Sequence, residues 1–94
     1  MAFDQENEIY FFKCKITFNN DTDLFVIESF RKEEIHYSYH WQDRGGKLLI
    51  RWDNAPHHKK IETYPYHMHN PDVQPSSLMN LKEILDYIEK LIQN

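Results

Sequence analysis

The sequence predicts an α+β fold of two layers, in which an antiparallel sheet of four to five strands carries a C-terminal amphipathic helix on one face. Four runs alternate apolar and polar residues with the period of a strand, and the last run has helical spacing. A chain of 94 residues builds one core. We expect a single domain, 1–94, with strands at about 9–18, 24–31, 34–42 and 47–53, a histidine-rich loop at 54–75 and a helix at about 77–92.

The first two strands are predicted to form a hairpin. In YFFKCKITF, one face of the strand carries Tyr10, Phe12, Cys14, Ile16 and Phe18. The NNDTD run at 19–23 has the composition of a turn. LFVIESFR follows with apolar residues on both faces near its start, which indicates a strand that is partly covered on both sides.

The third and fourth strands are predicted to have two chemically different faces. One face is apolar and the other is polar: Ile35, Tyr37, Tyr39, Trp41, Leu48, Ile50 and Trp52 against His36, Ser38, His40, Gln42, Arg51 and Asp53. Pairing Gln42 with Lys47 across the turn at 43–46 would set Ser38 opposite Arg51 and His36 opposite Asp53. A bulge at the glycines of that turn would change this register.

The final run, SSLMNLKEILDYIEKLIQN, is predicted to be the amphipathic helix. Its apolar positions have helical spacing: Leu78, Leu81, Ile84, Leu85, Ile88, Leu91 and Ile92. Ser77 could cap the helix, or Asn80 could do so with Glu83 as its capping-box partner. The apolar stripe needs a sheet face to cover, and we expect it to cover the aromatic face of the third and fourth strands.

Composition predicts a cytoplasmic protein that does not enter a membrane. Hydrophobic residues make up 40% and charged residues 28% of the chain, and no apolar segment approaches membrane-spanning length. The start, MAFDQENEIY, lacks the pattern of a signal peptide. The single cysteine, Cys14, suits a reducing compartment and is expected to be a small core residue.

The charge distribution leaves nucleic-acid binding open. A formal net charge of −4 counts against indiscriminate binding to phosphates. Between positions 44 and 60, however, five cations face one acid, Asp53: these are Arg44, Lys47, Arg51, Lys59 and Lys60. A local positive surface and an ordinary mixed surface are both compatible with this pattern.

The histidine-rich loop offers a metal site as one hypothesis. His67 and His69 are two residues apart and would share a face, whereas the adjacent His57 and His58 would point to opposite sides. A zinc site could combine His67, His69, one of His57 or His58, and Asp53. The signal has low specificity, since no HExxH or CxxC element accompanies it, and surface histidines are the simpler interpretation.

The preferred hypothesis uses the same residues without a metal or cofactor. Histidine moves protons near neutral pH and arginine stabilises charge on a phosphate, which together suit RNA cleavage through its own 2′-hydroxyl. The predicted catalytic residues are His57, His58, Arg51, Asp53 and His40, with Asp53 orienting a histidine. The predicted substrate-binding residues are Lys59, His67, His69 and Tyr39.

The run YSYHWQD…GKLLIRWDNAPHH, followed by TYPYHMHN and a PSSL-type entry to the helix, resembles the TumE family of toxins from prokaryotic toxin–antitoxin pairs. The resemblance extends from about Tyr37 to the helix, and DNAPHH is its most specific part. The motif residues carried over are Tyr39, His40, Gln42, Asp43, Arg51, Asp53, Asn54, Pro56, His57, His58, Pro65, His67 and His69. Relatives often have histidine where this chain has Tyr66, which counts against a dense metal cluster in that segment.

The resemblance implies a toxin held inactive by a cognate antitoxin that carries a DNA-binding domain. Three function classes stay open. The first is a ribonuclease, the second is a binding module that inhibits its target by occupancy through the histidines with Tyr64 and Tyr66, and the third is an inactive member in which DNAPHH is only a turn. Expected partners are the antitoxin and RNA; a homodimer stays open.

Overall fold

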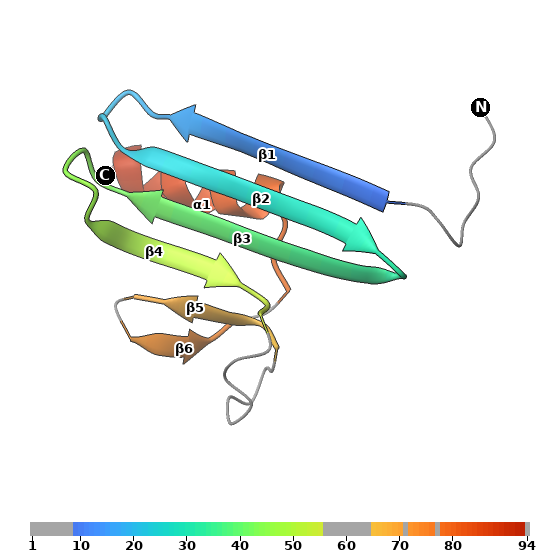
Figure 1. Cartoon of the computed structure of the whole chain (residues 1–94). Helices are drawn as coiled ribbons and strands as arrows, with labels where there is room; N and C mark the ends of the chain where they lie inside the picture. The colour runs from blue at the N-terminus through green and yellow to red at the C-terminus, as the bar shows by residue number, and fades with distance from the viewer. Residues whose placement is uncertain (1–8, 56–64, 71, 77, 94) are drawn as a thin grey trace.

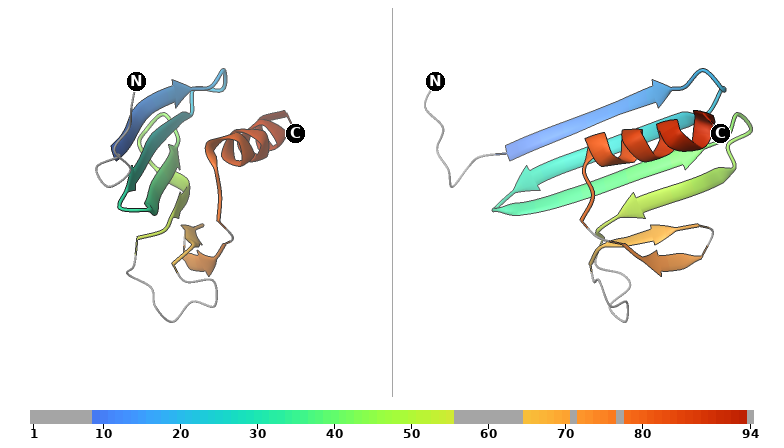
Figure 2. Two further views of the ribbon diagram at one scale, coloured as in Figure 1. Left: turned by 90° about the vertical axis from the view of Figure 1, so that its right-hand side faces the viewer. Right: turned by 180° about the vertical axis from the view of Figure 1, so that it is seen from behind.

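The computed structural model describes residues 9–55, 65–70, 72–76 and 78–93. Its elements are β1 (Ile9–Thr17), β2 (Asp23–Arg31), β3 (Glu34–Gln42), β4 (Leu48–Asp53), β5 (His67–His69), β6 (Val73–Pro75) and α1 (Leu81–Gln93). The strands form one sheet in chain order, and each strand is antiparallel to its neighbour (Figure 1). The helix lies against one face of this sheet, as the two further views show (Figure 2).

The core lies between α1 and the aromatic face of the central strands. It consists of Leu24, Val26, Tyr37, Tyr39, Trp41, Ile50, Trp52, Ile84 and Ile88. Ile84 and Ile88 are fully buried, and the rings of Trp52 and Tyr87 meet edge-on with centroids 5.5 Å apart. The predicted α+β fold and the predicted helix-covered face are both confirmed.

The prediction of four to five strands is corrected to six within the part of the chain that the structure describes. The additional strands, β5 and β6, lie inside the segment 54–75 that we expected to be a loop. Each has only three residues, which is too short for a period of two to be recognised in a sequence. β5 pairs with β4, so that His67 lies opposite Asp53 and His69 opposite Arg51.

The predicted register between β3 and β4 is wrong by two residues. His40 lies opposite Arg51 and Ser38 opposite Asp53, with a register shift between Trp41 and Gln42. Gly46 has φ of +89°, and the Asp43 side chain accepts the backbone N–H groups of Gly45 and Lys47. The bulge and turn add residues to the connection, but a shift of two leaves every side chain on its predicted face.

The ends of α1 and of the strands follow local signals. Asn80 caps the helix through its Oδ1, which accepts the Glu83 N–H at 2.9 Å, whereas Ser77, the other predicted cap, lies outside the described residues. In the turn between β2 and β3, Lys32 and Glu33 have φ of 53° and 64°. Residues other than glycine rarely adopt this left-handed backbone conformation. Among the described residues, α1 is too short and too polar to cross a membrane.

Candidate functional site

The sheet face away from α1, here called the outer face, carries the polar candidate residues in two rows that run across the strands. One row contains His40 on β3, Arg51 on β4 and His69 on β5. The next row contains Ser38, Asp53 and His67 on the same three strands. Directly opposed side chains in a sheet have Cβ atoms about 5 Å apart, so the registers alone bring these residues together.

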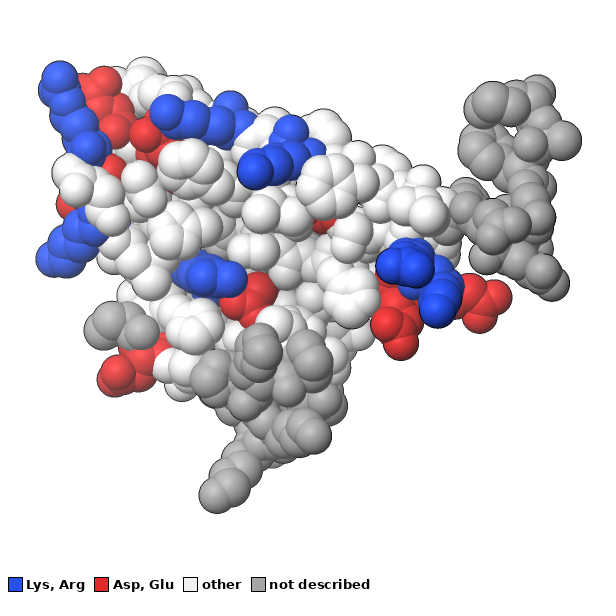
Figure 3. All heavy atoms as spheres, viewed as in Figure 1, with Lys and Arg blue, Asp and Glu red and all other residues white. Residues whose placement is uncertain are grey.

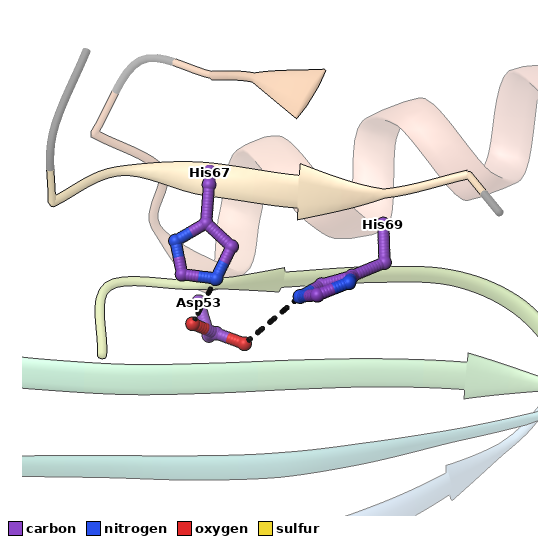
Figure 4. A group of neighbouring side chains, drawn as sticks. All are labelled: Asp53, His67 and His69. Carbon is purple, nitrogen blue, oxygen red and sulfur yellow. Dashed lines mark ion pairs between the residues drawn. The ribbon is translucent and has the colours of Figure 1, made fainter. Parts of the chain in front are cut away.

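Asp53 is the centre of the site. Its Oδ1 lies 2.7 Å from His67 Nε2 and accepts a hydrogen bond from the Ala55 N–H at 3.1 Å. Its Oδ2 forms an ion pair with Arg51 Nε at 3.0 Å, and His69 Nε2 lies 3.8 Å from the same oxygen. Figure 4 shows both imidazole rings, carried by β5, directed toward the carboxylate on β4. Burial of a carboxylate is tolerated because its oxygens have these partners.

His67 is fixed at both ring nitrogens. Its Nδ1 lies 2.9 Å from the carbonyl oxygen of Pro65, and its Nε2 contacts Asp53. Its side chain is only 3% exposed, whereas the side chain of His69 is 23% exposed. The two rings meet edge-on with centroids 5.1 Å apart. His67 is therefore placed for a positioning role, whereas His69 is accessible from outside.

Arg51 stands at the border between the buried carboxylate and solvent. Its side chain is 44% exposed while its partner Asp53 is buried, and Nε lies 3.0 Å from Asp53 Oδ2 as an ion pair without an aligned hydrogen bond, so the guanidinium can still meet an external anion. A hollow of about 210 Å³ opens on this face, and its lining includes Arg51, Asp53, Ser38, His36 and Ala55. This hollow could admit a phosphate or a small polar group.

His40 is placed beside Arg51 with a defined hydrogen-bond partner. Its Nε2 lies 3.0 Å from Gln42 Oε1, and Phe25 packs edge-on against the ring. Because a carbonyl oxygen only accepts, Nε2 is the donor, and Nδ1 of the neutral ring then carries the lone pair. That nitrogen is the one able to accept a proton from a substrate.

The Asn54 side chain bonds to the backbone of β3 and so serves the fold. Its Oδ1 accepts the Tyr37 N–H at 2.9 Å, and its Nδ2 donates to the Ile35 carbonyl oxygen at 2.6 Å. The buried amide therefore continues the pairing of β3 with β4 beyond the end of β4.

Tyr39, predicted to bind substrate, lies on the opposite face beneath α1 and does not join the cluster. Its hydroxyl donates to Glu28 Oε2 at 2.5 Å. Burial, supplemented by the Glu28 contact, raises the pKa of Tyr39, and burial raises the pKa of Tyr37 to about 12. Both tyrosines are neutral parts of the core at ordinary pH.

Several predicted site residues lie outside the described part of the chain: Pro56, His57, His58 and Lys59. On the outer face in Figure 3, the visible Lys and Arg side chains are spread over several separate places, and several of them lie directly beside Asp or Glu. Among the described residues this face is therefore a mixed surface with one anchored arginine rather than a continuous basic patch.

The sequence predicted most residues of this cluster but not the contacts between them. The shared face of His67 and His69 was visible from their spacing, and Asp53 was expected to orient a histidine. The histidine found against it is His67, and the support from the Pro65 carbonyl had no sequence signal beyond proximity. Asp53, His67 and His69 also form the one group in the described chain whose ligand atoms, all within 4.8 Å of one another, could hold a metal ion.

Comparison with known families agrees with the pattern of the site. The family model described as Toxin TumE matches residues 2–92, nearly the whole chain. The chain belongs to the TumE toxin family. The resemblance noted from the DNAPHH and HMH segments is thereby confirmed, and membership of a toxin family implies a cognate antitoxin as partner. No curated protein and no solved structure matches the chain.

Proposed function

We propose that this TumE toxin acts on RNA and cleaves it through the 2′-hydroxyl, without a metal in the chemical step. The observation that carries the proposal is the row of His40 and His69 on either side of Arg51, with Arg51 anchored by the buried Asp53. Cleavage of a phosphodiester by the 2′-hydroxyl of the same RNA needs at least a cation that binds the phosphate and a neighbouring group that transfers a proton.

In the proposed reaction, His40 Nδ1 takes the proton of the 2′-hydroxyl while Arg51 holds the phosphate. The 2′-oxygen attacks phosphorus, the bond from phosphorus to the 5′-oxygen breaks, and the leaving oxygen receives a proton. The products are a 2′,3′-cyclic phosphate and a 5′-hydroxyl. His57 or His58, which the sequence places two and three residues beyond Ala55 at the edge of the hollow, is proposed as the acid.

The remaining residues are proposed to bind and position. In this proposal, Asp53 holds the Arg51 guanidinium, and His67 orients the Asp53 carboxylate. His69 and Lys59 contact the substrate. The dispersed cations and the net charge of −4 favour few phosphate contacts and a structured or narrowly defined RNA target. We also propose that the antitoxin carries a DNA-binding domain, in keeping with the arrangement of such pairs.

The test is cleavage of total cellular RNA by the purified protein in excess EDTA, with identification of the product ends. We expect cyclic phosphate ends. The His40→Ala variant and the His57→Ala, His58→Ala double variant should each lower the rate by about 10²- to 10⁴-fold. His36→Ala is the comparison variant: His36 is an exposed histidine on the same strand and face that lines the hollow but does not lie opposite Arg51, so its loss should lower the rate far less than the loss of His40.

Two results would count against the proposal. Absence of cleavage with and without EDTA, combined with growth arrest on expression, would favour inhibition by occupancy. A loss of cleavage in His36→Ala equal to that in His40→Ala would contradict the specific assignment of His40 as the base, because His36 lines the same hollow without lying opposite Arg51.

A further inference from the structure

We infer that Asp53, His67 and His69 form a binding site for a single Zn²⁺-like divalent ion at the junction of β4 and β5. The inference goes beyond the proposed RNA cleavage, which assigns no metal, and its test is binding. The three side chains come from adjacent antiparallel strands and direct Oδ1, Oδ2 and two Nε2 atoms at one another (Figure 4).

The hydrogen bonding of His67 supplies the first argument. The Pro65 carbonyl oxygen only accepts, so His67 Nδ1 must donate to it. The neutral ring then has its lone pair on Nε2, which lies 2.7 Å from a carboxylate oxygen of Asp53. Two electron-rich atoms at this distance in a buried place require a proton or another cation between them.

The same hydrogen bond is the typical support of a metal ligand. A histidine that ligates through Nε2 usually donates its Nδ1–H to a carbonyl or carboxylate, which fixes the ring and its tautomer. His67 has this arrangement with Pro65, held in the short segment that leads into β5. The ring is therefore oriented in advance for an ion on its Asp53 side.

The separations suit zinc after small side-chain rotations. Zn²⁺ bonds of about 2.0–2.1 Å in tetrahedral geometry hold ligand atoms roughly 3.4 Å apart. The two measured pairs lie on either side of this value, with 2.7 Å from Asp53 Oδ1 to His67 Nε2 and 3.8 Å from Asp53 Oδ2 to His69 Nε2. Imidazole and carboxylate are ligands that zinc accepts, and three protein ligands leave a fourth position for water or an external group.

The positive charge of Arg51 disfavours binding of a metal ion at Asp53. It contacts Asp53 Oδ2 at 3.0 Å, but its side chain is nearly half exposed, so that it can turn toward solvent while the carboxylate turns toward an ion. Replacing Arg51 with Gln should consequently tighten metal binding, the opposite of what loss of a ligand does.

The experiment is titration of the EDTA-stripped, dialysed full chain with Zn²⁺ by calorimetry and with Co²⁺ by visible absorption. We expect one ion per chain, the absorption bands of a tetrahedral Co²⁺ site, and a rise in Tm on adding Zn²⁺. His69→Ala, which removes a partly exposed ligand and should fold, is expected to raise the Zn²⁺ Kd at least about tenfold and to remove the Tm rise. Asp53→Asn, which keeps the shape of the side chain, should do the same.

His36→Ala is the control for surface histidines and should bind Zn²⁺ as the parent does. Failure of the parent to bind would overturn the inference and leave Asp53 and His67 as a structural hydrogen-bonded pair. An equal weakening in His36→Ala, or binding lost in the His57→Ala, His58→Ala double variant but kept in His69→Ala, would overturn it as well. None of these outcomes depends on RNA cleavage, so this inference and the proposed function fail separately.

Discussion

On the face of the sheet toward α1, the buried side chains of β3 and β4 are Tyr37, Tyr39, Trp41, Ile50 and Trp52, whereas the buried side chains in the outer-face cluster are Asp53 and His67. The two faces consist of alternate residues of the same strands. The inner face is buried by packing, which many apolar side chains could supply. The outer cluster is buried by specific partners, since each polar atom needs a matching one. The comparison predicts that substitutions on the inner face act mainly on stability, whereas substitutions on the outer face act mainly on the proposed chemistry.

The largest expected effect is on chemistry. If the proposed function holds, Arg51→Ala should reduce RNA cleavage by about 10²- to 10³-fold, because it removes the charge that we propose holds the phosphate. Because its partner Asp53 is buried, loss of this ion pair should also lower the free energy of unfolding by about 1–3 kcal/mol. Cleavage rates and urea denaturation measure both quantities. If the loss of cleavage were explained by the fraction of unfolded protein, Arg51 would have a structural role only, and the prediction would be wrong.

A core substitution should show the reverse pattern. Ile88→Ala removes a fully buried side chain of α1 and should lower the free energy of unfolding by about 2–5 kcal/mol, with the cleavage rate per folded molecule unchanged. Leu91→Ala, on the same helix but 45% exposed, is the control and should cost far less. If both variants cost the same, the packing of α1 on the sheet differs from that described.

Asn54 lies next to Asp53 in sequence and separates the two roles within one motif. Asn54→Ala should lower the free energy of unfolding by about 1–3 kcal/mol, because it leaves the Tyr37 N–H and the Ile35 carbonyl without this partner. Asn70→Ala, at an exposed asparagine, should leave stability nearly unchanged. Denaturation curves measure the difference, and a selective loss of cleavage without loss of stability would instead make Asn54 part of the site.

The inner face should be sensitive to alkaline pH. Burial raises the pKa of Tyr37 from 10.0 in the unfolded chain to about 12, and Tyr39 is shifted in the same direction. A folded-state pKa above the unfolded value means that this stabilisation is complete below pH 10 and is lost as the pH rises from 10 toward 12. Denaturation midpoints across that window measure the loss, and Tyr39→Phe should make it smaller. A midpoint constant from pH 10 to 12 would contradict the prediction.

The smallest expected effect lies at the turn between β2 and β3, away from both buried clusters. Glu33→Gly should raise the free energy of unfolding by about 1 kcal/mol, because glycine adopts the φ of 64° without steric cost. Glu34→Gly, one residue later and inside β3, should lower it by about 0.5–1 kcal/mol. Equal effects of both substitutions would mean that the turn conformation is not the cause.

The sequence was informative where one local rule decided the outcome. The faces of β3 and β4 follow from a period of two. A register error of two residues leaves each side chain on the face that was predicted for it. The register itself depended on the shift between Trp41 and Gln42, where Leu49 of β4 has no partner in the register, and β5 was hidden because three residues carry no recognisable period. The shared face of His67 and His69 was predictable from spacing. Their contact with Asp53 was not, since it arises from pairing between segments that are distant in sequence.

The hairpin of β5 and β6 is held to the rest of the sheet by a short pairing of β5 with β4. Both strands have three residues, and β5 carries both histidines of the cluster. Local opening of such a unit requires far less free energy than global unfolding. Amide hydrogens of β5 should therefore exchange faster than those of β2 and β3, and a molecule that retains its entire aromatic core can lose the site. An antitoxin that displaced β5 from β4 would disarm the protein without unfolding it.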